Sequence, residues 1–206
     1  MGIRRYIKNM FQHIGHTRFH LNRIDERLNP ITSMVQKYHA QFRVAILQDK
    51  IVNCTTMGIT SESICDHEVI VSLTTYGKRI YDVALTIESI MQGTIKPNRI
   101  ILWLSEVEFK NSKLPHSLLL QEKRGLQIMY CEDLLSYKKL IPTLQNYPQA
   151  CVVTIDDDVI YDSNFLSNIL IAHHAQPHAI CAGRIHRMKL DQNKKPLSYI
   201  HWQEII

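Results

Sequence analysis

The spacing of apolar residues changes once along this chain, and the first pattern is helical. Between residues 21 and 45 the spacing alternates between three and four, which is a heptad repeat. The series comprises Leu21, Ile24, Leu28, Ile31, Val35, Tyr38, Phe42 and Ala45. Asn29 and Pro30 interrupt it as a cap and a first helical residue would, so we expect two helical pieces within residues 1–48. The pattern fits a helical hairpin on its own domain and a short coiled coil between chains equally well.

The second pattern begins near residue 67, where short apolar runs alternate with amphipathic stretches. Residues 49–66 have no sustained period and many turn-forming residues, which predicts a linker. Strands are expected at residues 68–75, 98–105, 125–133 and 150–158, helices at 81–92, 114–124, 136–147 and 163–175, and a last strand at 179–185. Apolar strands alternating with helices indicate a mostly parallel sheet with helices on both faces. We therefore predict an α/β domain over residues 67–206, preceded by an α-helical N-terminal arm.

Composition limits the class of protein. The 206 residues, 45% of them hydrophobic, suffice for one core and an appendage. The sequence has no apolar run long enough for a bilayer span or a signal peptide, so we expect a cytoplasmic protein. The net charge is +5, and its excess lies near the N-terminus, which favours contact with the inner face of the membrane or with an acidic partner. These basic residues are Arg4, Arg5, Lys8, Arg18 and Arg23. Nucleic acid is not expected, because basic and aromatic residues are not interleaved.

Chemically active residues follow three of the predicted strands. They are residues 74–79 after the first strand, Glu132 and Asp133 after the third, and Asp156, Asp157 and Asp158 after the fourth. Ligands of parallel α/β sheets collect outside the carboxyl ends of the strands. Three adjacent carboxylates repel one another unless a cation neutralises them, and hard oxygen ligands favour Mg²⁺ or Mn²⁺ together with substrate phosphates. If this segment is extended, Asp156 and Asp158 point one way and Asp157 the other.

Basic residues beside these carboxylates are candidates for phosphate binding. Lys78 and Arg79 open one predicted helix, and Lys138 and Lys139 open another. The simpler interpretation treats the lysines as solvated surface residues and the aspartates as an acidic loop that caps the helix after Asp162.

The segments VIVSLTTYGKRIYDVALTIESI, KPNRIILWLS, GLQIMYCEDLLSYKKLIPTL and VVTIDDDVIY, in this order, resemble bacterial family 2-like glycosyltransferases of the GT-A fold from surface-polysaccharide gene clusters. The resemblance spans residues 68–189 and implies a nucleotide-diphosphate sugar donor and a saccharide or lipid-linked acceptor. It places Thr74, Thr75 and Tyr76 at the nucleoside and Asp133 near the base. It also implies that Asp156 and Asp157 bind the ribose and diphosphate, and that Asp156 and Asp158 bind Mn²⁺ or Mg²⁺.

The resemblance leaves the catalytic base open. In this fold it lies well downstream of the aspartates, where Asp191 and Glu204 are the candidates, and His186 or His201 would be an additional metal ligand. We expect a C-terminally shortened acceptor half. One alternative is a haloacid dehalogenase-type phosphohydrolase, which Ile160 and the late position of the aspartate motif disfavour. The other is a non-catalytic scaffold that joins other polysaccharide enzymes through the heptad arm. The same arm is a candidate for homodimer formation.

Overall fold

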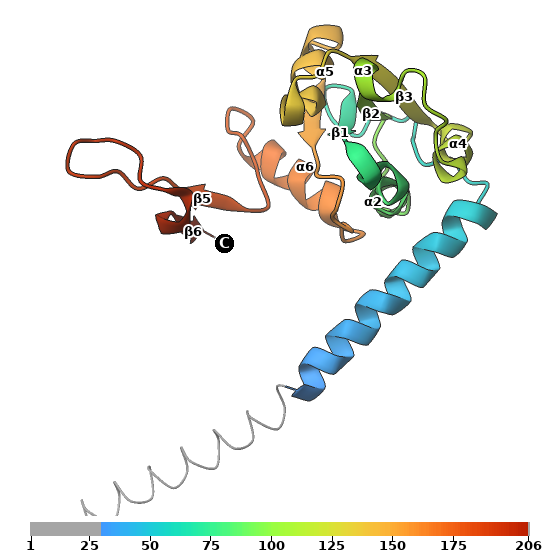
Figure 1. Cartoon of the computed structure of the whole chain (residues 1–206), viewed down its shortest axis with the longest axis horizontal. Helices are drawn as coiled ribbons and strands as arrows, with labels where there is room; N and C mark the ends of the chain where they lie inside the picture. Colours follow the sequence, from blue (N-terminus) through green and yellow to red (C-terminus); the bar gives the residue numbers. More distant parts are fainter. Residues whose placement is uncertain (1–29, 206) are drawn as a thin grey trace, which may run out of the picture. The chain divides into compact units, whose positions relative to one another are not determined.

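The computed structural model describes residues 30–205, and their side chains as far as residue 203 (Figure 1). The chain divides into two compact units, Met1–Asp49 and Lys50–Ile206. The predicted helical piece before Pro30 and the N-terminal basic residues lie outside the described residues.

One helix occupies residues 30–53. It therefore continues into the stretch that the sequence assigned to the linker, and the physical reason is Ile51, which is buried in the core of the sheet domain. Residues 54–68 then contain neither helix nor strand.

Four parallel strands form the sheet of the second unit, in the order β3-β2-β1-β4. They are β1 (Val69–Thr74), β2 (Arg99–Ser105), β3 (Leu126–Cys131) and β4 (Cys151–Thr154). The predicted parallel α/β architecture is thus confirmed. Successive strands are added on one side of β1, as β2 and then β3, before β4 is added on its other side, so the order of strands reverses between β1 and β4. Such a switch point is where parallel α/β sheets bind ligands.

Alternate residues of the strands point to opposite faces, and each face has its own apolar cluster. Val71 and Leu102 belong to the larger cluster, together with side chains of α2 (Val83–Met91), α4 (His116–Glu122) and α6 (Phe165–Ala175). Ile70, Ile101 and Trp103 form the smaller cluster on the other face.

Helix α5 (Ile141–Asn146) is tied to that second face by a buried hydroxyl. Thr143 Oγ1 accepts a hydrogen bond from Trp103 Nε1 at 2.7 Å and lies 2.8 Å from Ser72 Oγ. Buried polar atoms need such partners, so Thr143 fixes α5 against β1 and β2. Helices therefore cover both faces of the sheet.

A buried ion pair joins α2 to the turn after α4. Arg124 donates to both carboxylate oxygens of Glu88, at 2.9 and 3.0 Å, and both residues are almost fully buried. Gln121 and Gln92 also donate to this carboxylate. The fully hydrogen-bonded pair is a fixed clamp between the two helices.

The prediction of a strand at residues 179–185 is wrong. Residues 176–184 have no regular structure and Ile180 is fully exposed, so this stretch has no apolar face to pack on the sheet. Only Ile185 is extended, as the start of β5 (Ile185–Arg187), which pairs antiparallel with β6 (Gln203–Ile205). No helix within residues 30–205 combines the length and apolarity needed to cross a bilayer.

Candidate functional site

A cavity of about 460 Å³ lies at the carboxyl ends of the strands, at the switch point between β1 and β4. Its lining comes from η1 (Gly77–Tyr81), α3 (Glu106–Phe109), η2 (Leu135–Lys139) and the segments that follow β1, β3 and β4. All eight residues that the sequence assigned to the nucleotide sugar line this one cavity: Thr74, Thr75, Tyr76, Arg79, Asp133, Lys139, Asp156 and Asp157. Residues up to 83 positions apart in the sequence are thereby brought together.

Asp157 is the structural member of the aspartate run. It is only 7% exposed, and its carboxylate accepts hydrogen bonds from Thr75 Oγ1 at 2.6 Å and from Arg79 at 2.9 Å. Its carbonyl oxygen accepts a hydrogen bond from the buried Thr86 hydroxyl. The end of β1 and helix α2 therefore hold this residue from both sides.

Arg79 connects two of the aspartates. Its guanidinium contacts Asp157 and also Asp158, at 2.6 Å, and lies 5.2 Å from the centre of the Tyr76 ring. The Asp157 carboxylate, and to a smaller extent that of Asp158, raises the pKa of Arg79 further above its ordinary value. Arg79 is thus a permanent positive charge in the lining of the cavity.

Asp156 and Asp158 face outward. Their side chains are 65% and 53% exposed, in contrast to that of Asp157. Lys139 Nζ lies 2.5 Å from one oxygen of Asp156, and the backbone N–H of Asp156 donates to the Tyr161 hydroxyl at 3.0 Å. Arg79 and Lys139 therefore supply counter-charges that the sequence argument left to a metal ion.

Asp133 and Lys138 form a further pair in the lining of the cavity. The buried Lys138 ammonium donates to Asp133, and this hydrogen bond, reinforced by the backbone N–H of Leu135, lowers the pKa of the carboxyl. Leu135, which donates this N–H, has a positive φ of 52°. Lys138 is thus occupied by Asp133, whereas Lys139 points toward the aspartate run.

Glu108 and Tyr161 are polar neighbours of the site that the sequence did not identify. Glu108 of α3 lines the cavity and accepts the backbone N–H of Gly77 at 2.6 Å. Tyr161 supports the Asp156 backbone, and burial raises the pKa of its phenol. Glu108 follows β2, the one strand end for which the sequence predicts no site residue, whereas no local pattern marks Tyr161.

The carboxylates of the site are the candidate metal ligands. Within residues 30–205, no three His, Cys, Asp or Glu side chains are grouped so as to hold a metal ion. Among the same residues, the second carboxylate oxygens of Asp156 and Asp158 have no hydrogen-bond partner. One or two carboxylates, completed by water and substrate phosphates, is the usual ligand set of Mg²⁺. Asp156 and Asp158 therefore fit an ion whose remaining ligands are waters or substrate oxygens.

The downstream candidates do not join this site. Asp191 accepts the backbone N–H groups of Asn193 and Lys195 and closes its own turn. His186 packs against Tyr199, and neither it nor His201 lines the cavity. The side chain of Glu204 lies outside the described residues.

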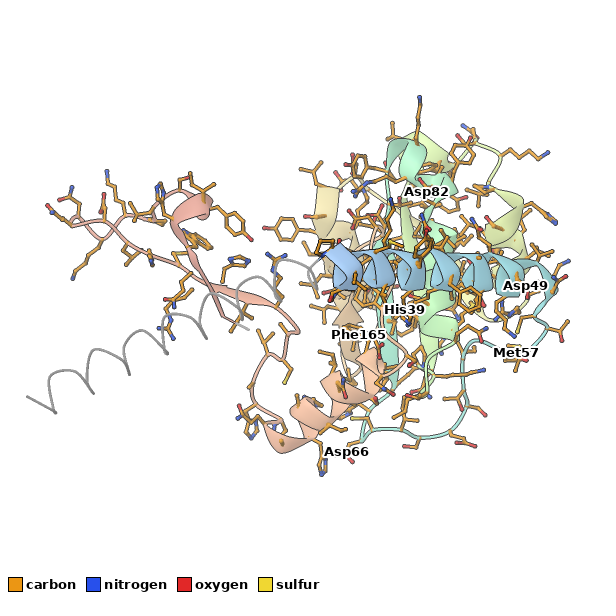
Figure 2. All side chains as sticks on the ribbon, turned by 90° about the horizontal axis from the view of Figure 1, so that it is seen from below. His39, Asp49, Met57, Asp66, Asp82 and Phe165 are labelled. Atoms are coloured by element: carbon orange, nitrogen blue, oxygen red, sulfur yellow. The ribbon has the colours of Figure 1, made fainter. Side chains whose placement is uncertain are left out.

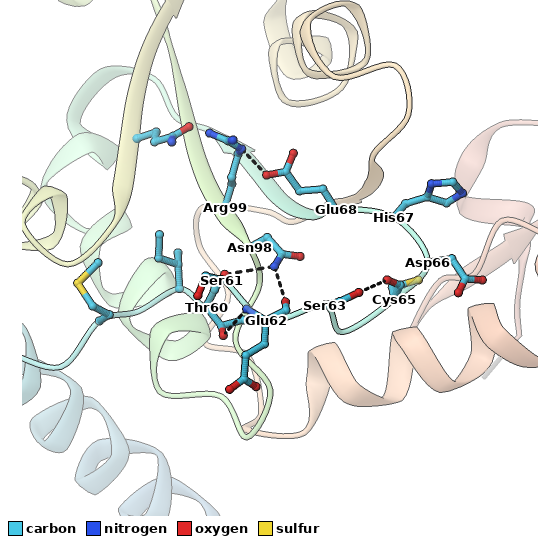
Figure 3. Close-up of a pocket in the computed structure, with 13 residues that line it drawn as sticks. Thr60, Ser61, Glu62, Ser63, Cys65, Asp66, His67, Glu68, Asn98 and Arg99 are labelled. Carbon is cyan, nitrogen blue, oxygen red and sulfur yellow. Dashed lines mark hydrogen bonds and ion pairs between the residues drawn. The ribbon is translucent and has the colours of Figure 1, made fainter.

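A second hollow, of about 650 Å³, lies at the amino ends of the strands, where residues 57–68 run beside β2 (Figure 3). Asn98 donates to the carbonyl oxygens of Thr60 and Glu62 and accepts the N–H of Val69, and Arg99 contacts Glu68 at 2.6 Å. These polar groups tie the linker to the sheet, which assigns this hollow a structural role.

No protein-family model and no curated protein matches this chain.

Proposed function

We propose that residues 67–206 bind a nucleotide-diphosphate sugar and belong to a metal-dependent glycosyltransferase of the GT-A type. The observation that carries the proposal is the cavity at the switch point, which is lined by the exposed Asp156 and by two cations, Arg79 and Lys139. The exposed Asp158 is not part of this lining but contacts Arg79 at 2.6 Å. A neutral metabolite would need neither charge. A metal–diphosphate complex needs both, because its phosphates attract the cations and its metal attracts the carboxylates.

The proposal assigns a part of the donor to each wall. The nucleoside lies against Tyr76 and the Thr74 and Thr75 segment, within reach of Asp133. The diphosphate lies between Arg79 and Lys139. A volume of about 460 Å³ is in the range of small-molecule sites, which supports a ligand of this size.

Asp156 and Asp158 would hold Mn²⁺ or Mg²⁺. When bound, such an ion stabilises negative charge that develops on a departing diphosphate. Arg79 adds a fixed positive charge at the same place, and Thr75 keeps Asp157 oriented so that Arg79 stays in position. When the diphosphate binds, the Lys139 ammonium moves its contact from the Asp156 carboxylate to a phosphate oxygen. Asp156 is then free to bind the metal ion.

The partners and location expected from the sequence stay part of the proposal. The acceptor is a saccharide or a lipid-linked saccharide, and the enzyme works in the cytoplasm at the inner face of the membrane. The acceptor site and the catalytic base are not assigned to any residue.

One observation favours a second candidate, a scaffold that binds nucleotide without metal or not at all. The aspartates are already compensated by Arg79 and Lys139, so the site is electrostatically satisfied without a divalent ion. Under this alternative, added Mn²⁺ has no effect on nucleotide affinity.

Calorimetric titration with UDP- and GDP-sugars, with and without Mn²⁺, separates the two. We expect metal-dependent binding that Asp158→Ala abolishes. Lys139→Ala should weaken binding of the nucleotide about tenfold or more, since it removes a charge-assisted contact. The same change should strengthen binding of Mn²⁺ alone, because Asp156 is no longer paired.

Lys78→Ala is the matched control, because Lys78 is exposed, neighbours Arg79 and does not line the cavity. It should bind as the wild type does. Nucleotide affinity that is the same with and without Mn²⁺ would reject the metal-dependent enzyme and favour the scaffold.

A further inference from the structure

The helix at residues 30–53 has an apolar face that nothing in the described part of the chain covers. Six large side chains on it are 44–69% exposed: Ile31, Met34, Val35, Tyr38, Phe42 and Ile46. We call these six residues the seam. Figure 2 shows the helix, with His39 and Asp49 labelled, and its side chains as sticks.

The seam and the buried side of the helix point in opposite directions. At 3.6 residues per turn, Leu47 and Ile51 lie diametrically opposite the line through Val35, Tyr38 and Phe42. Leu47 and Ile51 are both buried, at 4% and 7% exposure. Both lie near the end of the helix, whereas residues 30–42 are exposed on all sides. The seam is therefore the apolar side of an exposed stretch of helix.

The seam also has the spacing and the flanks of a coiled coil. Val35 and Phe42 occupy a positions, Ile31 and Tyr38 occupy d positions, and the same register extends back in the sequence through Leu28, Ile24 and Leu21. Within residues 30–48, the flanking e and g positions carry no Asp, Glu, Lys or Arg, whereas Lys37 and Arg43 lie away from the seam. Two identical copies therefore meet without repulsion between like charges.

The exposed area is of the size that self-association needs. Soluble monomers seldom leave more than a few hundred Å² of contiguous apolar surface exposed. An aromatic side chain offers about 150–250 Å², so the seam as a whole exposes on the order of 500 Å². This is more than half of the roughly 800 Å² per partner of a standard interface, before the heptads preceding residue 30 are counted.

We propose that the seam binds the seam of a second copy of this chain, forming a two-stranded coiled coil. In this arrangement Val35 and Phe42 at a and Ile31 and Tyr38 at d form the contact line between the two helices. This proposal does not depend on the nucleotide-sugar site and is tested without any ligand.

Light scattering and sedimentation of the full chain, over a wide range of protein concentration, test the proposal. We expect a mass of twice 24.0 kDa. Phe42→Glu should weaken association by roughly a hundredfold or more, because it places two like charges at an apolar contact. Phe42→Leu, which keeps an apolar a position, should still form the dimer.

Gln36→Glu is the matched control: it adds the same charge at an exposed position outside the seam, and it should leave the dimer intact. Circular dichroism confirms that each variant keeps its helix and sheet. A wild-type monomer at every concentration would overturn the proposal, as it would mean that residues 1–29 or a different protein cover the seam. Association that survives Phe42→Glu would overturn it as well.

Discussion

At the level of single residues, the three aspartates differ in burial although they are consecutive. Asp157 is buried and accepts two side-chain hydrogen bonds, while Asp156 and Asp158 face solvent. The sequence argument placed Asp157 apart from the other two on the condition that the segment is extended, but β4 ends at Thr154 and Asp157 and Asp158 lie in a turn. The burial of Asp157 depends on Thr75 and Arg79, which β1 and η1 place beside β4.

The same difference predicts unequal costs of substitution. Asp157→Ala should lower the free energy of unfolding by about 2 kcal/mol, because it leaves the buried Thr75 hydroxyl without its acceptor. Asp158→Ala removes only a solvent-exposed ion pair and should change stability little. Urea denaturation of the two variants measures both, and equal losses would mean that Asp157 does not support the fold.

At the level of elements, the sequence predicted the parallel strands well and the side-chain clamps poorly. Continuous apolar runs such as residues 69–73 identify a strand buried on both faces, and the turn chemistry after each run fixed the edge where the site lies. Glu88 in α2 and Arg124 in the turn after α4 stand 36 positions apart, and no periodicity links them. For the same reason Tyr161 and Glu108 escaped notice. Pairings across elements follow from packing, which local patterns do not encode.

The clamp between α2 and the turn after α4 gives a prediction at this level. Glu88→Gln keeps the shape of the side chain but leaves the buried Arg124 without a counter-charge, which should cost about 3–5 kcal/mol. The control is Glu106→Gln, which removes an exposed i,i+4 contact to Lys110 and should cost at most about 0.5 kcal/mol. Chemical denaturation compares the two. A similar, small loss in both variants would contradict the role assigned to the clamp.

At the level of the whole molecule, stability should fall at both extremes of pH. The hydrogen bond from Lys138 lowers the pKa of Asp133 in the folded state, so its contribution is present above the unfolded value of about 3.9 and is lost as pH falls. Burial raises the pKa of Cys131, Cys151 and Tyr161, so their contribution is present below the unfolded values of about 8.5–10 and is lost as pH rises.

Thermal unfolding as a function of pH measures the loss of stability at acid pH (the acid limb) and at alkaline pH (the alkaline limb). Asp133→Asn should flatten the acid limb alone, and Tyr161→Phe should reduce only the part of the alkaline limb above about pH 10. An unchanged acid limb in Asp133→Asn would show that other carboxylates dominate it.

The strand order also sets when the site can form during synthesis. Strands β1, β2 and β3 are neighbours in both sequence and sheet, so they can pair while the ribosome is still adding later residues. Strand β4 must return across them to the free edge of β1, bringing Asp157 to a hydroxyl made 82 residues earlier. Until that moment Thr75 lacks its partner, and Arg79 is an ordinary solvated cation. The nascent chain therefore acquires its charged pocket last, in the same event that completes the sheet.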